Sequence, residues 1–172
     1  EQFLLEDIGE ETLDHLDVRR GDDLVEIEVA YDRTELTVDD TVEVSVDVSL
    51  HASAGGGNEN AGAAVAEQAI IDLGVPPGFS VETEDLSRLV ARFQDVPEDY
   101  AYAQIRRFEL TGRQIILYVS NLTSDRPLSF SYRLRAKFPL KAQTPASVAY
   151  DYYNPSTAAE AAPQVLTVIS GE

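Results

Sequence analysis

Residues 137–155, KFPLKAQTPASVAYDYYNP, decide the fold class of this chain. They share Lys137 with residues 128–137, in which apolar and polar side chains strictly alternate. Such alternation is typical of a strand with one buried face and one face in water. The stretch then ends in a tyrosine-rich strand, which Pro155 is expected to stop. This sequence carries no catalytic chemistry of its own, and it predicts β-structure.

The alternation assigns each side chain of this strand to a face. The inward set is expected to be Leu128, Phe130, Tyr132, Leu134, Ala136 and Phe138. The outward set is expected to be Ser129, Ser131, Arg133, Arg135 and Lys137. Upstream, residues 25–29 and 42–50 alternate in the same way, and Asp39-Asp40 supplies a turn between them.

Further strands are predicted on both sides of the chain's midpoint. They cover residues 65–73, 105–110, 114–119, 148–152 and 165–169. In the tyrosine strand, Val148, Tyr150 and Tyr152 share the inward face, whereas Asp151 and Tyr153 lie on the other face. Thr111-Gly112 is a hairpin signal, and the glycine-rich residues 51–63 read as a hairpin tip. About seven to nine short strands with turns between them predict an antiparallel β-sandwich.

One amphipathic helix is predicted over residues 82–93. Its apolar side chains recur at helical spacing and form one stripe: Leu86, Leu89, Val90 and Phe93. Ser80 or Thr83 can cap its start, and Pro97 is expected to stop it.

Length and composition limit the possible functions. The 172 residues suffice for one domain, assigned to residues 24–172, with residues 1–23 as a linker or the tail of a preceding domain. Cysteine is absent, which removes disulfides and zinc–thiolate sites. The net charge is −18, and residues 1–87 carry 23 acidic and 3 basic side chains. Nucleic acid is therefore an improbable partner, because a phosphate track needs clustered positive charge.

No pattern points to an enzyme, a metal or a cofactor. His15 and His51 are the two histidines, and neither has a partner at metal-ligand or triad spacing. The acidic pairs, such as Asp39-Asp40, lack the spaced-ligand loop of a tight calcium site. The sequence therefore predicts no catalytic residue, no metal and no cofactor.

Five segments, taken in order, resemble the C-terminal receptor-binding domain of the alpha-2-macroglobulin family. They are YDRTELTVDDTVEVSVDV (31–48), DLGVPPGFSV (72–81), RRFELTGRQIILYVSNL (106–122), PLSFSYRLRAKFPLKAQTP (127–145) and YDYYNP (150–155), with the helix after the second. The resemblance implies a non-enzymatic module of a bacterial-type, protease-trapping inhibitor located outside the cell or in the periplasm. Its implied partners are the thioester and macroglobulin domains of the same parent chain, target proteases reached through the parent, and a receptor.

The resemblance also implies two interaction sites. In animal members the helix presents two lysines to a receptor, and those positions match Thr83 and Ser87, which carry no charge. Arg88 and Arg92 form a nearby basic pair, read either as a solvated face or as a contact. In bacterial members the end of the tyrosine strand covers the thioester. The matching positions are Tyr152 and Tyr153, of which Tyr153 is the better lid candidate because alternation places Tyr152 in the core.

Arg133, Arg135 and Lys137 form a basic stripe on one strand face. Either this stripe pairs with carboxylates across the sheet, or it docks an adjacent domain. For the whole chain, the alternative to a macroglobulin module is an Ig-like structural or adhesive module of a bacterial surface protein, which shares the alternating strands.

Overall fold

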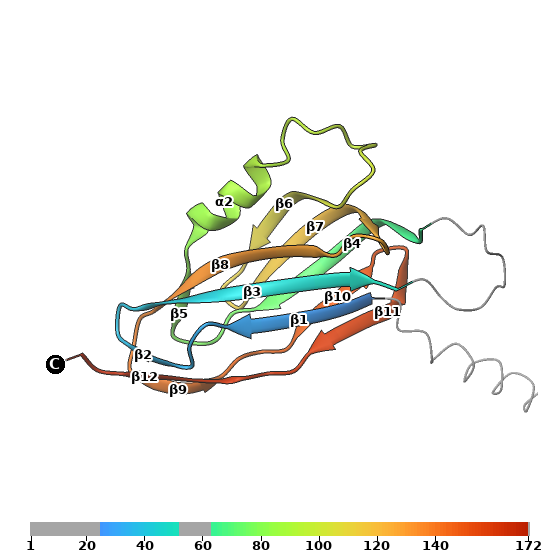
Figure 1. Ribbon diagram of the computed structural model, residues 1–172. Helices are drawn as coiled ribbons and strands as arrows, with labels where there is room; N and C mark the ends of the chain where they lie inside the picture. The colour runs from blue at the N-terminus through green and yellow to red at the C-terminus, as the bar shows by residue number, and fades with distance from the viewer. Residues whose placement is uncertain (1–24, 52–62, 172) are drawn as a thin grey trace, which may run out of the picture.

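The computed structural model describes residues 25–51 and 63–171, whose arrangement is shown in Figure 1. The prediction for residues 1–23 and most of the glycine-rich stretch lie outside these ranges. The described residues form twelve strands and one helix. The elements are β1 (Val25–Tyr31), β2 (Glu35–Thr37), β3 (Thr41–Leu50), β4 (Val65–Gly74), β5 (Phe79–Val81), α2 (Thr83–Ala91), β6 (Gln104–Leu110), β7 (Gln114–Thr123), β8 (Leu128–Ala136), β9 (Leu140–Gln143), β10 (Ser147–Asp151), β11 (Asn154–Ala161) and β12 (Val165–Ile169).

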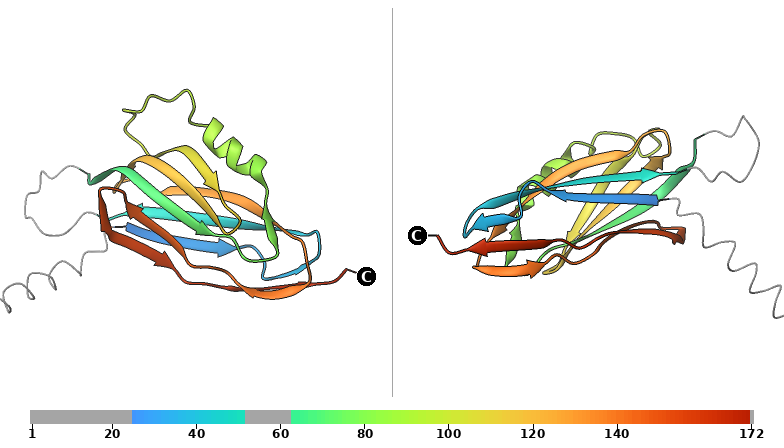
Figure 2. Two further views of the ribbon diagram at one scale, coloured as in Figure 1. Left: turned by 180° about the vertical axis from the view of Figure 1, so that it is seen from behind. Right: turned by 60° about the horizontal axis from the view of Figure 1, so that its bottom comes forward.

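The strands form two large sheets and a small one. The front sheet has the order β1-β3-β8-β5, the back sheet β11-β10-β4-β7-β6, and the end sheet β2-β12-β9. The front and back sheets stack as two layers, with β1 against β10 and β11 (Figures 1 and 2). Within the described ranges every strand pair is antiparallel except β2 with β12, which is parallel over three residues. The predicted antiparallel sandwich is confirmed, apart from this short pair.

The core lies between the two large sheets. In the front sheet, Val44 pairs with Tyr132 and Val46 with Phe130, and all four side chains are buried. Their inward direction follows from the period of two, and each buried valine stabilises the fold by roughly 1.5–3 kcal/mol. Between them, polar side chains such as those of Ser45 and Ser131 face water. The alternation predicted for β3 and β8 is therefore confirmed.

Phe138 departs from that prediction, because it is 64% exposed and does not face inward. The strand ends at Ala136, and the Lys137 amide donates to the carbonyl of Gly78 (2.8 Å). A period of two holds only while the chain remains a strand, so the residues after Ala136 lose it.

The face assignment in β10 was wrong. Ser147 and Ala149 are buried, whereas Val148 and Tyr150 lie on the outer side and are only partly buried. The inward face of β10 contacts β1 of the opposite layer. The inward positions of β10 hold small side chains, and its large side chains point outward. Sequence alternation alone does not tell which of two faces is covered.

Tyr152 lies in a turn and is exposed, so it is not a core residue either. Pro155 does not stop a strand but lies inside β11. It is tolerated there because β11 is the edge strand of the back sheet and its register shifts opposite Tyr150. Twelve strands instead of the predicted seven to nine reflect β11 and the short strands β2, β5 and β9, which show no clear alternation.

Helix α2 is slightly shorter than predicted and lies against β6 and β8, at the side where β5 and β6 are the edge strands (Figure 1). Leu86 and Leu89 are buried, while Val90 and Phe93 are partly buried against the core. This confirms the predicted apolar stripe. Neither Ser80 nor Thr83 caps the helix: the N-cap is Glu82, without a side-chain cap hydrogen bond. Within the described residues, no helix is long and apolar enough to span a membrane.

Candidate functional site

The two candidate lid residues form the tip of the β10–β11 hairpin. Asp151 pairs with Asn154, and Tyr152 and Tyr153 make the two-residue turn between them. Their side chains are 54% and 68% exposed. The rings contact each other edge-to-face, with centroids 5.4 Å apart and planes at 85°. Both tyrosines therefore project from the sandwich as one aromatic pair, and the expectation that Tyr152 packs in the core is wrong.

Side chains at its base hold the hairpin in shape. The Tyr153 amide donates to Asp151 Oδ1 (3.0 Å), and the Asp151 amide donates to Thr157 Oγ1 (3.1 Å). The buried Thr157 hydroxyl in turn donates to the Asn154 carbonyl (2.8 Å). The Tyr152 amide donates to the Gln68 carbonyl of β4 (2.9 Å), which ties the turn to the sheet. These bonds orient the exposed rings without using the ring hydroxyls.

Both tyrosines border a groove of about 590 Å³ at the outer side of the back sheet. Its floor comes from β4, β6 and β7, and Glu98 extends from the loop after α2. The residues that line it are Glu67, Gln68, Ala69, Ile70, Glu98, Arg106, Arg107, Tyr118, Val119, Ser120, Asn121, Tyr152 and Tyr153. We refer to it as the tyrosine groove.

Two polar side chains fasten the loop that forms one wall of the tyrosine groove. Arg106 donates through Nη1 to the Val96 carbonyl and through Nη2 to the Pro97 carbonyl, both at 2.9 Å. Asn121, which has a positive φ of 55°, donates through Nδ2 to the carbonyls of Glu98 (2.8 Å) and Tyr100 (2.7 Å). Asparagine tolerates this left-handed conformation better than most residues. The wall is therefore built by side-chain bonds to backbone.

The tyrosine groove continues into a row of apolar and aromatic side chains on the outer face of the back sheet. Ile70 pairs with Tyr118 on one side and with Tyr150 on the other, and it is only 6% exposed although it alternates with the core residues of β4. In the next row, Asp72 lies between Val148 and Ile116. Burial among these neighbours raises the pKa of the Asp72 carboxyl.

The predicted helix face is exposed, and its two arginines differ in their ion pairing. Thr83, Ser87, Arg88 and Arg92 all lie on the outside of α2. Arg88 forms an ion pair with Glu84 (3.2 Å), whereas Arg92 makes none within the described ranges. The two arginines therefore differ in what they offer to a partner.

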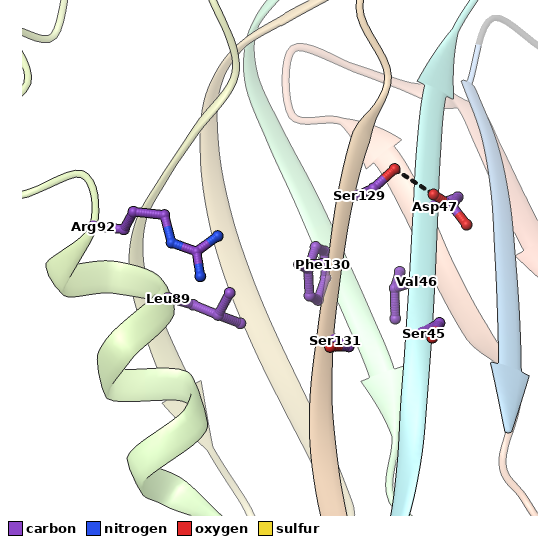
Figure 3. Close-up of a pocket in the computed structure, with 8 residues that line it drawn as sticks. All are labelled: Ser45, Val46, Asp47, Leu89, Arg92, Ser129, Phe130 and Ser131. Carbon is purple, nitrogen blue, oxygen red and sulfur yellow. Dashed lines mark hydrogen bonds between the residues drawn. The ribbon is translucent and has the colours of Figure 1, made fainter. Parts of the chain in front are cut away.

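Arg92 extends over a second groove, of about 420 Å³, between α2 and the outer face of the front sheet (Figure 3). Its other lining residues are Ser45, Val46, Asp47, Leu89, Ser129, Phe130 and Ser131. Ser129 donates a hydrogen bond to Asp47 across β8 and β3. The lining therefore combines short polar side chains of β3 and β8 with Leu89 and Arg92 on the helix side.

The predicted basic stripe is largely used within the fold. Arg133 binds Asp85 through Nε and Nη2, both at 2.9 Å, and Arg135 binds Glu82 through Nε (2.7 Å). The Arg133 guanidinium lowers the pKa of the Asp85 carboxyl. The stripe therefore pairs with carboxylates at the start of α2, which holds the helix against β8. Lys137 is exposed and makes no ion pair among residues 25–51 and 63–171.

Several of these residues were not found from the sequence. Thr157, Asn121 and Arg106 shape the hairpin and the groove, yet no spacing in the sequence marks them. Their partners are 3 to 23 residues away, and most are backbone carbonyls, which carry no sequence signal. The described residues contain no group of three or more side chains placed to hold a metal ion.

The described residues have the architecture of an antiparallel β-sandwich domain with helix α2 at its side. The family model for the A-macroglobulin receptor binding domain matches residues 64–163, which is more than half of the chain. This chain therefore belongs to that family. The matched region contains the hairpin, the tyrosine groove and helix α2.

Solved structures of bacterial alpha-2-macroglobulins share the fold. Native alpha-2-macroglobulin of Escherichia coli, from domain MG7 to the C-terminus, is 19% identical with a TM-score of 0.64 over 84% of this chain and 23% of that chain. The Salmonella protein reacted with methylamine is 18% identical with a TM-score of 0.63, over 84% and 9%. The trypsin-activated Escherichia coli protein is 17% identical with a TM-score of 0.62, over 84% and 10%.

This chain thus spans between 9% and 23% of the length of these relatives. At such identities the likeness concerns the fold. A search of curated proteins gives no match.

Proposed function

We propose that this chain is the C-terminal module of an alpha-2-macroglobulin-like protease-trapping inhibitor. In this role it docks on the thioester domain of its parent, shields the thioester, and becomes exposed after a protease cuts the bait segment. The Tyr152–Tyr153 hairpin is the lid. Membership of the receptor-binding domain family favours this role over an Ig-like adhesive module.

The exposed aromatic pair is the observation that carries the proposal. Two tyrosines on a two-residue turn leave a large apolar area in water, stabilised by bonds at the hairpin base and not by the core. Tyrosine is enriched at protein interfaces because its ring is apolar and its hydroxyl can bind water or a partner. A thioester is an acyl donor, and a closed apolar cover keeps water from it.

The location of the hairpin agrees with this role. The described chain enters at Val25, and β1 begins at the same end of the sandwich as the hairpin (Figures 1 and 2). The chain therefore enters the described fold at the hairpin end. The relatives supply a second support: one is described as reacted with methylamine and another as trypsin-activated, which fits an electrophile released by proteolysis.

In this proposal the module performs no chemistry itself and needs no cofactor. Its partners are the thioester and macroglobulin domains of the parent, with target proteases reached through the parent and a receptor after activation. A trap of this kind acts where foreign proteases are met, so we place it outside the cell or in the periplasm.

The test needs the intact parent with Tyr153→Ala, Tyr152→Ala and the double variant. We expect the thioester to react with methylamine at least tenfold faster in the double variant, a barrier change of about 1.4 kcal/mol. Phe138→Ala is the matched control, because Phe138 is an equally exposed aromatic residue that follows the far end of β8. An unchanged thioester lifetime in the double variant would remove the hairpin from the lid role.

A further inference from the structure

The tyrosine groove has an unusual balance of hydrogen-bonding groups. Its two guanidinium groups are already bound inside the fold. Arg106 donates to Ser120 Oγ and to the carbonyls of Val96 and Pro97, at 2.9–3.0 Å. Arg107 lies over the Tyr118 ring, 3.7 Å from its centroid, and donates to Glu109 (2.9 Å).

The amide nitrogen of Asn121 is likewise used, by the carbonyls of Glu98 and Tyr100. The acceptors of the groove are not used in this way. Among the described residues, the Glu67 and Glu98 carboxylates make no ion pair and accept no hydrogen bond. A ligand in this groove therefore meets two unpaired carboxylates, while both guanidinium groups are bound within the fold and the neutral hydroxyls can donate or accept. This arrangement favours a ligand group that donates hydrogen bonds and carries positive charge.

The aromatic walls favour the same kind of ligand. Tyr152 and Tyr153 border the groove with exposed rings, whose faces attract cations. Two tyrosines nearby already bind guanidinium groups in this way. Arg107 lies over Tyr118 and Arg126 over Tyr102, each 3.7 Å from the ring centroid. A guanidinium or ammonium group placed between a tyrosine ring and a glutamate would be stabilised by a cation–π contact with the ring and by an ion pair with the carboxylate.

We propose that the tyrosine groove binds an arginine or lysine side chain presented by the neighbouring domain of the parent chain. This inference rests on the proposed docking function and names the kind of side chain that the docking site would recognise. The aromatic pair supplies the apolar contact, and the Glu67 and Glu98 carboxylates select a basic anchor on the domain that the hairpin covers. The complementarity is electrostatic, because the Glu67 and Glu98 carboxylates are unpaired, whereas Arg107 is paired with Glu109 and Arg106 is bound to backbone carbonyls.

The groove can be tested on this 172-residue chain without the parent. The probes are Nα-acetyl-arginine amide and Nα-acetyl-citrulline amide, which has nearly the same shape but no charge. In an NMR titration we expect saturable shifts of the Gln68, Ser120 and Asn121 amides with the arginine probe. The citrulline probe should bind at least about fivefold more weakly, since the partly exposed ion pairs and the cation–π contact each contribute modestly.

The variant Glu67→Gln/Glu98→Gln should weaken the arginine probe about fivefold. Its matched control is Glu35→Gln/Glu160→Gln, which removes the same charge at exposed positions on the end sheet and on β11, outside the groove. Equal affinity for the two probes, or full affinity in the groove variant, would overturn the proposal. Shifts that depend on chain concentration without any probe would assign the groove to a second copy and also overturn it.

In the intact parent, Glu67→Gln/Glu98→Gln should shorten the thioester lifetime relative to the control variant. An unchanged lifetime would overturn the assignment of the anchor to the neighbouring domain. This failure is distinct from failure of the lid, which is judged by the tyrosine variants. If the thioester lifetime shortens in the tyrosine variants but not in the groove variant, the proposed lid function is supported and the proposed basic anchor is overturned.

Discussion

The two outer faces of the sandwich are built differently. Along the strands of the front sheet, the outward side chains that alternate with the buried ones are short or charged, such as those of Ser45, Ser131 and Asp47. On the back sheet, the outward row contains Tyr150, Ile70 and Tyr118, and it leads to the tyrosine groove. The front face is typical of a surface in contact with water. The back face combines aromatic, aliphatic and arginine side chains, as in protein interfaces.

This difference also separates the carboxylates of the two sides. Asp85, at the front side, binds Arg133, and its pKa is lowered. Asp72, on the back face, lies between Val148 and Ile116, and its pKa is raised by burial. Asp85 near the front face is thus bound by a charged partner, whereas Asp72 on the back face is partly desolvated and accepts a hydrogen bond from the neutral Gln114 amide (2.9 Å). The back face is the one expected to dock.

The largest effect is expected from Ile70→Ala on the back face. Although Ile70 points away from the core, it is buried between two tyrosines, so its truncation should reduce the free energy of unfolding by about 2–4 kcal/mol. Urea unfolding measures this. Ser45→Ala, on the front face, is the control and should stay within about 0.5 kcal/mol. Equal effects of the two variants would contradict the distinction between the faces.

A smaller effect is expected from Asp85→Asn, which removes the charge that Arg133 binds. The loss should be about 1 kcal/mol near pH 7, since solvent screens this surface pair. Because the folded pKa of Asp85 is lowered, its contribution is present above the unfolded pKa and is lost as the pH falls through the folded value. Denaturation followed between pH 7 and pH 2 should therefore show a weaker acid dependence in Asp85→Asn than in the wild type.

Asp72→Asn provides the contrast within the same measurement. Its raised pKa means that its contribution to stability is present below the unfolded pKa and is lost as the pH rises through the folded value. Removing this charge should leave stability at neutral pH unchanged or higher. A loss of neutral-pH stability in Asp72→Asn as large as in Asp85→Asn would show that both carboxylates are paired alike, against the structure.

The two sheets also differ in how well side-chain burial could be predicted from the sequence. The alternation in β3 and β8 predicted the front sheet well, because apolar and polar side chains there coincide with buried and exposed positions. In β10 the same rule failed, since Tyr150 is large and outward while Ala149 is small and buried. Period-two patterns identify a strand, but they do not say which face has a neighbour.

The candidate site shows the same limit. Tyr152 and Tyr153 could be proposed from the resemblance of the YDYYNP segment, and alternation predicted that Tyr153 faces outward. The exposure of Tyr152 and the two-residue turn were not predicted. The tyrosine groove was not foreseen, because Glu67, Glu98 and Tyr118 meet only when three separate segments come together. The basic stripe was identified correctly as a stripe, yet its partners Glu82 and Asp85 lie on the helix and not across the sheet.

The most direct test of this account is the accessibility of the hairpin in the intact parent. Hydroxyl-radical labelling of Tyr152 and Tyr153 should be measured in the resting parent and after bait cleavage, with acetylation of the exposed Lys137, outside the hairpin and the groove, as the reference. We predict weak labelling of both tyrosines at rest, strong labelling after cleavage, and an unchanged Lys137. Equally strong labelling of the tyrosines in the two states would contradict the claim that this face is covered before the bait segment is cleaved.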